Sequence, residues 1–508
     1  MNLKTLISQI ETVSADGPLN IEVTGVQYDS RRVARGNVFV ALKGERSDGH
    51  AFLEQAVASG AAAVVTERAG SYAGRAAVVR VADTAVALGR LSAAFYDHPS
   101  RTLKVAGVTG TNGKTTFTFL LKSILEHHGI STGLIGTIRY ELGERKIPAD
   151  RTTPQSSDLQ NLLWQMKNAG CKGVVMEVSS HSLVQKRIEG VEYDVGVFTN
   201  LTQDHLDYHK TMEEYGRVKG LLFAGLGRAS KKKTAAVLNF DDPQGPRFRA
   251  LLGTNVSCYT YGYSEGVDLR ATEPRFSLNG THFVARTPKG TAEISLQLCG
   301  RYNVENALAA LGAALALDVP LGQAAEGLAR LANVPGRLEP VRESQPFHVF
   351  VDYAHTDDAL KNVLATLKDL VKGRLIMVFG CGGNRDAGKR PLMGRVAAHG
   401  AQHTVITSDN PRKEDPALIA RQIEQGFEGS TSLPSTGLRT GAAGGGTHEI
   451  ILDRAEAIHR AIELAEPGDV VLIAGKGHET YQEFADTRVP FDDRECVRNI
   501  LKQRVWKN

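Results

Sequence analysis

The 508-residue chain has few cysteines, no long apolar run and almost no excess of one charge. Its five cysteines are odd in number and include no Cys-x-x-Cys pair, so we expect neither a disulfide framework nor a zinc knuckle. The 60 basic and 56 acidic residues give a formal charge of +4, which indicates no nucleic-acid partner. The sequence has neither a signal peptide nor an apolar run of about 18 residues, so we expect a cytoplasmic protein with no membrane insertion.

The most informative segment is 107–116, Gly-Val-Thr-Gly-Thr-Asn-Gly-Lys-Thr-Thr, between a predicted strand and a predicted helix. A glycine-rich turn at a helix N-terminus presents backbone N–H groups to phosphate, Lys114 adds positive charge, and the Thr115 hydroxyl can bind Mg²⁺. The segment therefore predicts a nucleoside triphosphate ligand. Its glycine spacing departs from the usual pattern, because Val108 stands where an ordinary phosphate loop has its first glycine.

Glycine is abundant, and 52 glycines with 42% hydrophobic and 23% charged residues are typical of an α/β protein with many tight turns. A chain of this length is too long for one core, so we expect three domains. Strand-like and helix-like runs alternate, which predicts mostly parallel sheets. The predicted division is a small α/β domain at 1–100, a central ATPase-like domain at 101–335 and a Rossmann-like domain at 336–508.

Two strands of the predicted central domain end in polar residues. Glu177 closes the predicted strand 173–177, and His205 follows the predicted strand 195–199, so both should face the phosphate loop. A carboxylate, a histidine and the Thr115 hydroxyl are candidate Mg²⁺ ligands, although His205 taken alone is more typical of a capping or core residue. Lys219 lies on a helix-like stretch and, from the local pattern, is expected at the surface.

In the predicted third domain, three strands run into polar loops at 380–386, 409–412 and 475–479. Because ligands bind at the carboxyl ends of strands in open parallel sheets, we expect these loops to build one site. Arg385 and Arg412 have guanidinium groups that match carboxylates, and Glu479 offers the opposite charge, which suits the zwitterion of an amino acid. The Gly-, Ser- and Thr-rich segment 429–446 is predicted to be a flexible surface insertion.

These features together resemble the Mur ligase family, the ATP-dependent amide ligases that extend the peptidoglycan stem peptide. The resemblance spans nearly the whole chain and rests on segments 107–116, 200–209, 300–306, 334–337, 351–355 and 380–391. Within the family, segments 29–31 and 475–479 resemble the ligase that adds an amino acid to UDP-N-acetylmuramoyl-L-alanyl-D-glutamate. The form Asp-Asn-Pro-Arg at 409–412 resembles enzymes that add meso-2,6-diaminopimelate, whereas lysine-adding relatives lack the arginine.

The resemblance implies a role for each of several sets of residues. The expected ATP-binding residues are Gly110, Thr111, Asn112, Gly113, Lys114, Thr115, Thr116, Asn303, Arg337, Asp352 and His355. Those expected to contact the UDP-muramoyl dipeptide are Tyr28, Ser30, Thr152, Thr153, Ser179, Gln185 and Arg187. Those expected to contact diaminopimelate are Arg385, Asp409, Asn410, Pro411, Arg412, Gly475 and Glu479. The expected catalytic residues are Lys114, Glu177, His205 and Lys219.

The resemblance also gives Lys219 a new interpretation, because it occupies the position of the family's carbamylated lysine. As a carbamate it would join Thr115, Glu177 and His205 in holding Mg²⁺. The implied reaction phosphorylates the D-glutamyl carboxylate with ATP and then joins it to the incoming amine, in a protein that we expect to be a monomer. The family's uridine-contacting loop is replaced here by Glu-Arg-Ser at 45–47, which weakens the assignment at that end of the substrate.

Three alternatives stay open from the sequence. A lysine-adding ligase of the same family would leave the charges of Arg385 and Arg412 unpaired, a loss of about 1–3 kcal/mol. A folylpolyglutamate synthetase-like ligase is disfavoured by the Asp-Ser-Arg segment at 29–31 and by the first predicted domain. A nucleotide-binding switch protein would leave the opposite charges of the third domain without explanation.

Overall fold

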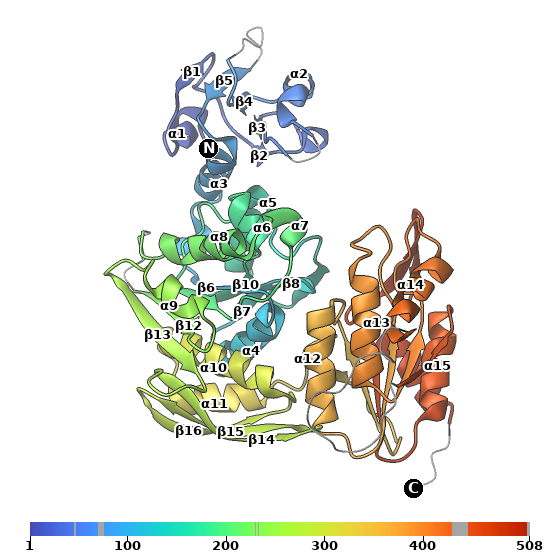
Figure 1. Ribbon diagram of the computed structural model, residues 1–508. Helices are drawn as coiled ribbons and strands as arrows, with labels where there is room; N and C mark the ends of the chain where they lie inside the picture. The colour runs from blue at the N-terminus through green and yellow to red at the C-terminus, as the bar shows by residue number, and fades with distance from the viewer. Residues whose placement is uncertain (45–46, 70–75, 229, 232, 429–445, 505–508) are drawn as a thin grey trace. The chain divides into compact units, whose positions relative to one another are not determined.

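The computed structural model describes residues 1–44, 47–69, 76–228, 230–231, 233–428 and 446–504 (Figure 1). Contacts between residues divide the chain into two compact units. The first comprises Met1–Thr272, Ala285–Ala292 and Glu305–Leu328, and the second comprises Glu273–Val284, Glu293–Val304 and Ala329–Asn508. The predicted boundaries near residues 100 and 335 stay predictions.

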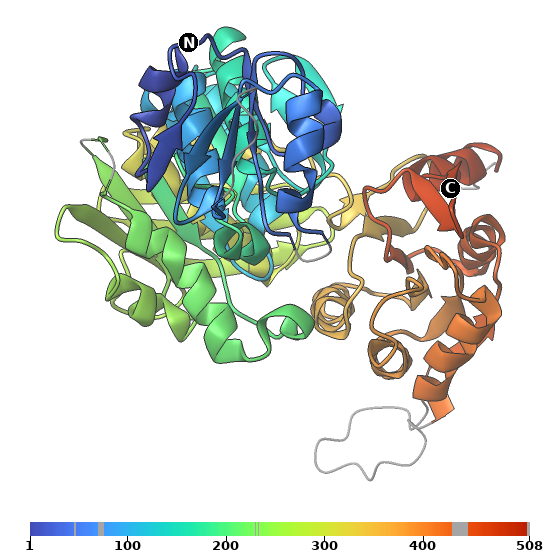
Figure 2. The same ribbon diagram turned by 90° about the horizontal axis from the view of Figure 1, so that it is seen from above.

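The N-terminal sheet is a small α/β unit with helices on both faces (Figure 2). Its strand order is β1-β5-β4-β3-β2, with β1 antiparallel to β5 and the other pairs parallel. Alternate residues of β3 pack on opposite faces, since Val38 and Val40 join the cluster of α1 and α3 while Phe39 joins that of α2. The bounds are α1 Leu3–Ile7, β1 Ser14–Asp16, β2 Gly25–Gln27, β3 Asn37–Val40, α2 Leu53–Ala58, β4 Ala63–Thr66, β5 Ala77–Arg80 and α3 Thr84–Phe95.

A larger sheet forms the centre of the first unit, and its middle strands run parallel in the order β13-β12-β11-β6-β10-β7. Strands β8 and β9 extend one edge in the antiparallel direction, so the sheet is mixed but mostly parallel, as predicted. The strand bounds are β6 Lys104–Thr109, β7 Thr132–Ile135, β8 Arg139–Leu142, β9 Arg145–Pro148, β10 Gly173–Glu177, β11 Val195–Phe198, β12 Thr234–Asn239, β13 Val256–Gly262, β14 Leu269–Ser277, β15 Gly280–Thr287 and β16 Gly290–Leu296.

The helices that accompany this sheet follow its strands in the chain, as expected for β-α-β connections. Their bounds are α4 Lys114–His127, α5 Ser156–Asn168, α6 Ser180–Val184, α7 Leu206–His209, α8 Met212–Gly225, α9 Gln244–Arg249, α10 Arg301–Ala316 and α11 Leu321–Ala329. Strand β6 is buried along almost its whole length because it lies between β10 and β11 in the middle of the sheet. The loop that follows β6 therefore starts from a buried strand that is paired on both sides.

The second unit contains a parallel sheet with the order β18-β22-β19-β20-β21, and β17 pairs antiparallel with β18. A separate hairpin, β23 and β24, follows the strand β22. The bounds are β17 Glu339–Pro340, β18 His348–Asp352, α12 Asp357–Lys368, β19 Leu375–Phe379, α13 Lys389–Gly400, β20 His403–Ile406, α14 Pro416–Glu428, β21 Thr447–Ile450, α15 Arg454–Leu464, β22 Val470–Ala474, β23 Tyr481–Phe484, β24 Thr487–Pro490 and α16 Asp493–Lys502.

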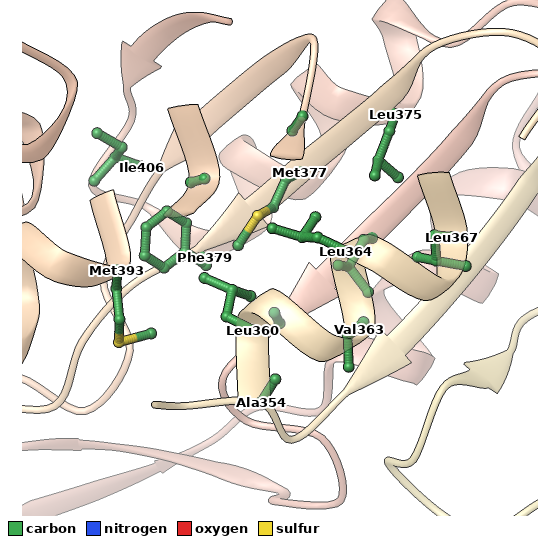
Figure 3. Close-up of a cluster of buried hydrophobic side chains, with 14 of the residues drawn as sticks. Ala354, Leu360, Val363, Leu364, Leu367, Leu375, Met377, Phe379, Met393 and Ile406 are labelled. Atoms are coloured by element: carbon green, nitrogen blue, oxygen red, sulfur yellow. The ribbon is translucent and has the colours of Figure 1, made fainter. Parts of the chain in front are cut away.

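Both faces of the parallel sheet are covered, and its central strands β19 and β22 are apolar and buried along their whole length. Figure 3 shows one face, where Leu360 and Leu364 of α12 pack against Met377 and Phe379 of β19. The opposite face carries Val378 and the helices α15 and α16. In open parallel sheets whose faces are covered in this way, ligands bind at the edge where the strands end.

Two segments that the sequence analysis names lie mostly outside the described residues. Of the predicted insertion at 429–446, only Gly446 is described. Residues 45–46, in the predicted uridine loop, also lie outside the described residues.

Candidate active site

The loop between β6 and α4 has a shape that only glycine permits at two positions. Gly110 has φ +154°, and a Cβ there would lie 1.8 Å from Thr199 Oγ1. Gly113 has φ +86°, and a Cβ there would lie 2.3 Å from Asn306 Oδ1. The unusual glycine spacing therefore reflects two close approaches, one from the end of β11 and one from α10.

The end of β11 holds the same loop by hydrogen bonds. The backbone N–H of Thr111 donates to the Asn200 carbonyl at 2.8 Å, and that of Asn112 donates to Asn200 Oδ1 at 2.9 Å. Thr199 Oγ1 donates to the Asn112 carbonyl at 2.6 Å. These bonds fix the loop at the N-terminus of α4, where backbone N–H groups and the helix dipole favour phosphate.

Two lysines donate to the same carbonyl of the loop, that of Gly110. Lys114 Nζ donates to the carbonyls of Gly110 and Thr111 at 2.9 and 2.8 Å, and Lys219 Nζ donates to the Gly110 carbonyl at 2.8 Å. The side chain of Lys219 is 1% exposed, and its Nζ lies 4.3 Å from the centre of the Tyr215 ring. Burial, followed by the charge of Lys114, lowers the pKa of Lys219 well below its usual value.

The local prediction of a surface position for Lys219 was wrong. Helix α8 buries Tyr215, Val218, Lys219, Leu222 and Phe223, which lie three or four residues apart and share one face. Lys219 is thus carried into the interior by the same helical spacing that buries its apolar neighbours. That spacing was a signal in the sequence that could have located it.

Glu177 is the last residue of β10, and its carboxylate lies next to the phosphate loop. Its Oε1 accepts from Thr115 Oγ1 at 3.0 Å and from the Thr137 N–H at 2.9 Å, and its Oε2 accepts from Thr137 Oγ1 at 3.0 Å. Thr137 was missed by the sequence analysis, because it follows a strand that carries no motif. A carboxylate beside a threonine hydroxyl at a phosphate loop fits the oxygen preference of Mg²⁺.

His205 lies apart from this pair as a half-exposed residue at the start of α7. Its side chain is 46% exposed, it contacts Asp204 at 3.5 Å, and its ring meets the edge of His181 at 5.1 Å between centres. In the described part of the chain, no three His, Cys, Asp or Glu side chains are grouped so that they could hold a metal ion. The residues that fit Mg²⁺ in this structure are therefore Thr115 and Glu177, with room for further oxygen ligands from a substrate.

Most residues expected to contact the UDP-muramoyl dipeptide form one cluster next to Glu177. Thr153 Oγ1 donates to the Glu177 carbonyl at 2.9 Å, and the carbonyl of Thr153 accepts from Arg187 Nη1 at 3.1 Å. Arg187 Nε donates to Gln185 Oε1 at 2.9 Å. Ser179 joins this cluster, since its N–H donates to Thr153 Oγ1 at 3.1 Å.

Thr152 belongs to the same cluster, whereas Tyr28 and Ser30 lie on the N-terminal sheet. Thr152 Oγ1 lies 3.0 Å from Thr137 Oγ1. Tyr28 Oη donates to Asp158 Oδ2 of α5 at 2.7 Å, and burial together with this bond raises the pKa of Tyr28. Ser30 Oγ donates to Gln55 at 3.3 Å, so the structure does not bring it to the cluster.

The remaining ATP-binding candidates lie in the second unit. Asp352 ends β18 and accepts the N–H groups of Leu338 and Ala354 at 2.6 and 2.7 Å, while burial raises its pKa. Tyr353 contacts two further candidates, Arg337 and His355. The Arg337 guanidinium lies 4.8 Å from the centre of the Tyr353 ring, and His355 Nδ1 lies 2.8 Å from the Tyr353 carbonyl oxygen. Asn303 is buried and donates to the Cys299 carbonyl at 2.8 Å.

The three predicted loops of the second unit meet at the carboxyl edge of its sheet, as expected. Asn410 connects them: its Nδ2 donates to Glu479 Oε2 at 2.8 Å, and its carbonyl accepts the Gly383 N–H at 2.9 Å. Its Oδ1 accepts from Lys476 Nζ at 3.0 Å. Asp409 lies under the third loop, since a Cβ at Gly475 would lie 2.5 Å from Asp409 Oδ2.

Both charges expected to bind the zwitterion already have partners, which the sequence analysis missed. Glu479 Oε2 accepts from the buried Lys476 at 3.0 Å as well as from Asn410, but among the described residues Glu479 Oε1 has no hydrogen-bond partner. Arg412 pairs with Glu483 of β23 at 3.0 Å. The partners were missed because Glu483 lies 71 residues from Arg412, on a hairpin with no motif.

Arg385 and Arg412 lie on either side of Gly382. A Cβ at Gly382 would lie 3.1 Å from Arg412 Nη1 and 3.8 Å from Arg385 Cγ. Arg385 is exposed, whereas Arg412 is half-buried. The Arg412 guanidinium and the aliphatic stem of Arg385 therefore both lie next to Gly382, at the edge of the loop cluster.

Family models match three segments of the chain. They are described as Mur ligase family, catalytic domain, for residues 22–96, Mur ligase middle domain for 108–314, and Mur ligase, glutamate ligase domain, for 336–477. The chain is 46% identical over 506 residues to a UDP-N-acetylmuramoyl-L-alanyl-D-glutamate--2,6-diaminopimelate ligase from Geobacillus kaustophilus, with 99% of this chain and 100% of that protein covered. The chain belongs to the Mur ligase family.

Other comparisons agree with this membership. An enzyme of the same name from Geobacillus thermodenitrificans is 46% identical, again over 99% of this chain and 100% of that protein. A solved structure of a UDP-N-acetylmuramoyl-L-alanyl-D-glutamate--2,6-diaminopimelate ligase matches with a TM-score of 0.71 and 33% identity, covering 99% of both chains. The three-domain α/β fold of the family and an ATP-dependent ligase activity follow. No helix of the described residues is long and apolar enough to cross a membrane.

Proposed function

We propose that this ligase joins meso-2,6-diaminopimelate to UDP-N-acetylmuramoyl-L-alanyl-D-glutamate, in peptidoglycan biosynthesis, with ATP as the energy source. The observation that carries the choice of amino acid is the loop cluster of the second unit. It presents an unpartnered carboxylate oxygen of Glu479 and, two residues after Asn410, the guanidinium of Arg412. An ammonium group suits the first and a carboxylate suits the second.

Diaminopimelate carries one more carboxylate than lysine, at its far end. Arg412, with Arg385 beside Gly382, is the partner that we assign to this carboxylate. Lysine would offer no carboxylate to the N–H donors of Arg412 that Glu483 does not use, at a cost of about 1–3 kcal/mol or roughly 5- to 150-fold in affinity. The curated relatives named above support the same amino acid.

The first step forms an acyl phosphate. An oxygen of the D-glutamyl γ-carboxylate attacks the γ-phosphorus of ATP, the bond to the β–γ bridging oxygen breaks, and ADP leaves. We assign Lys114 and the backbone N–H groups of the first turn of α4, residues 114–116, to the phosphates, where they stabilise negative charge that develops in transfer. Mg²⁺, held by Thr115 and Glu177, would neutralise phosphate charge when bound. We assign Arg187 to a carboxylate of the UDP-muramoyl dipeptide.

The second step forms the amide bond. The amine of the amino acid, after losing a proton, attacks the acyl carbon, and a tetrahedral intermediate collapses with loss of inorganic phosphate. Glu479 orients the reacting end of the amino acid through its unpartnered oxygen. The residues Arg337, Asp352 and His355 are our candidates for contact with the nucleotide.

We also propose that Lys219 is carbamylated in the active enzyme. Carbamylation requires the neutral amine, whose nitrogen bonds to the carbon of CO₂ while a proton is released. Burial at 1% exposure and the nearby charge of Lys114 both favour that neutral form. The product is an anion next to the phosphate loop, which would add oxygen ligands for a metal together with Thr115 and Glu177.

Phosphate release tests the proposed function. The purified protein is given ATP, Mg²⁺ and UDP-N-acetylmuramoyl-L-alanyl-D-glutamate, with either meso-2,6-diaminopimelate or L-lysine. We expect release that depends on diaminopimelate and is at least tenfold weaker with lysine. A preference for lysine would refute the assignment of Arg412, and no release with either amino acid would favour a nucleotide-binding protein without ligase activity.

A further inference from the structure

The hairpin formed by β23 and β24 holds Arg412 at both its backbone and its side chain. The Arg412 N–H donates to the Glu483 carbonyl at 2.9 Å, and the Arg412 carbonyl accepts the Ala485 N–H at 2.6 Å. Arg412 Nε donates to Glu483 Oε2 at 3.0 Å, and its Nη1 donates to the Gly383 carbonyl at 2.8 Å. Arg412 has φ +52°, a left-handed conformation that an arginine adopts only when its surroundings impose it.

These contacts leave part of the guanidinium available. An arginine has five N–H donors, and the bonds to Glu483 and Gly383 use two of them. The other three, on Nη1 and Nη2, have no acceptor among the described residues. A fork of this kind suits the two oxygens of one carboxylate.

We propose that Glu483 is a positioning residue that determines specificity for the amino acid. It holds the Arg412 guanidinium in the orientation that receives the distal carboxylate of the substrate, and it does so before the substrate binds. The inference rests on the proposed function, since it requires that Arg412 contacts that carboxylate. The hairpin thereby acts on substrate choice without touching the reacting atoms.

Glu483 has two effects on substrate binding, and they have opposite signs. Fixing the long Arg412 side chain in advance removes an entropic cost of binding, worth about two- to tenfold in affinity. The negative charge of Glu483, in contrast, weakens the attraction between Arg412 and an incoming carboxylate. The side chains of Arg412 and Glu483 are 23% and 24% exposed, so water screens the repulsion between Glu483 and the incoming carboxylate. We therefore expect the entropic gain from fixing Arg412 to dominate.

The test compares Glu483→Ala and Glu483→Gln with the unaltered enzyme in the phosphate-release assay. Glu483→Ala removes the anchor, so we expect the KM for diaminopimelate to rise about two- to tenfold. Glu483→Gln keeps an acceptor oxygen, so its rise should be smaller. The KM for L-lysine, which has no distal carboxylate, should stay unchanged, and the preference for diaminopimelate should fall by the same factor.

Asp486→Asn is the matched control. Asp486 lies in the turn of the same hairpin and contacts Lys413 at 3.5 Å, with side chains that are 86% and 67% exposed. It removes a carboxylate from the hairpin without touching the Arg412 guanidinium, so all KM values should stay at those of the unaltered enzyme. The KM for ATP should not change in any variant, which shows that each one folds.

Three outcomes would overturn the inference while the proposed function stands. They are an unchanged KM for diaminopimelate in Glu483→Ala, a lowered one, or an equal rise for diaminopimelate and lysine. The last result would mean that Glu483 only supports the loops. If the unaltered enzyme prefers lysine or uses neither amino acid, the proposed function itself fails, whatever the variants do.

Discussion

The buried pair of Arg454 and Asp493 gives the sharpest stability prediction. Both side chains are 0% exposed, and Arg454 Nε and Nη2 donate to the two Asp493 oxygens at 2.7 and 2.8 Å. Arg454 also donates to the carbonyls of Ser408 and Ala474, at 3.2 and 3.0 Å. These carbonyls come immediately before Asp409 and Gly475, so the pair joins α15 and α16 to the bases of two substrate loops.

Asp493→Ala removes the anion and leaves a buried cation. Breaking a buried ion pair in this way costs about 3–5 kcal/mol. The hydrogen bonds from Arg454 to the Ser408 and Ala474 carbonyls remain and stabilise part of its charge. We therefore expect the free energy of unfolding to fall by about 3 kcal/mol, near the lower end of this range. Asp493→Asn keeps one acceptor oxygen and should cost less, about 1–3 kcal/mol.

Hydrogen exchange measured by mass spectrometry, over Arg454–Leu464 and Asp493–Lys502, is the suitable assay. Glu463→Ala is the control: Glu463 is on the same helix and pairs with Arg504 at 3.0 Å at the surface, so its loss should cost about 0–1 kcal/mol.

The reasoning would be refuted if Asp493→Ala lowered the free energy of opening by no more than Glu463→Ala does. Equal effects of Asp493→Ala and Asp493→Asn would show that the acceptor oxygen kept by Asn contributes nothing and that the lost charge accounts for the whole cost. The hydrogen bonds from Arg454 to the Ser408 and Ala474 carbonyls should hold the following loops in position. Asp493→Ala should therefore also raise the KM for diaminopimelate, with the KM for the UDP-muramoyl dipeptide unchanged. An unaltered KM for diaminopimelate would show that the substrate loops keep their positions without the pair.

Three further predictions concern the first unit. Lys219→Ala should reduce phosphate release about a hundredfold or more, since it removes the proposed anion at the phosphate loop; activity within tenfold of the unaltered enzyme would exclude the carbamate. Gly113→Ala should weaken ATP binding at least tenfold in calorimetry, because φ is +86° and the new Cβ would lie 2.3 Å from Asn306 Oδ1; unchanged binding would contradict this geometry. Burial, with the charges of nearby His181 and Lys219, lowers the pKa of His209 to about 4, so the unfolded state binds more protons between pH 6.5 and 4. The free energy of unfolding should therefore fall by less than about 3 kcal/mol as the pH drops through this window. Urea titrations at several pH values should show that His209→Gln lacks this pH-dependent loss.

The phosphate loop was predictable because its signal is local. A buried strand, a glycine-rich turn and Lys114 at the start of a helix lie within a few residues of one another, and the structure confirms the order β6, loop, α4. The alternation of strands and helices likewise predicted the mostly parallel sheets. The meeting of the loops that contain Asp409 and Gly475 followed from a general rule, since carboxyl ends of parallel strands share one edge.

The partners of the charged residues were not predictable from the same patterns. Glu483 is 71 residues from Arg412, and Asp493 is 39 residues from Arg454. No periodicity relates such positions, because the fold alone sets the distance between them. Lys219 is an intermediate case, as the spacing of apolar residues in α8 contained the signal but a lysine is rarely expected inside.

The sequence by itself therefore determined the family, the nucleotide loop and the types of residue that a ligase of this kind requires. These follow from short segments whose backbone conformation and charge are set by neighbouring residues. The tertiary structure alone decided which charges are already paired, which atoms stay open and which side chains hold the others in place. The sequence shows that Glu479 and Arg412 carry opposite charges, but only the packed fold shows that Lys476 pairs with the first and Glu483 with the second.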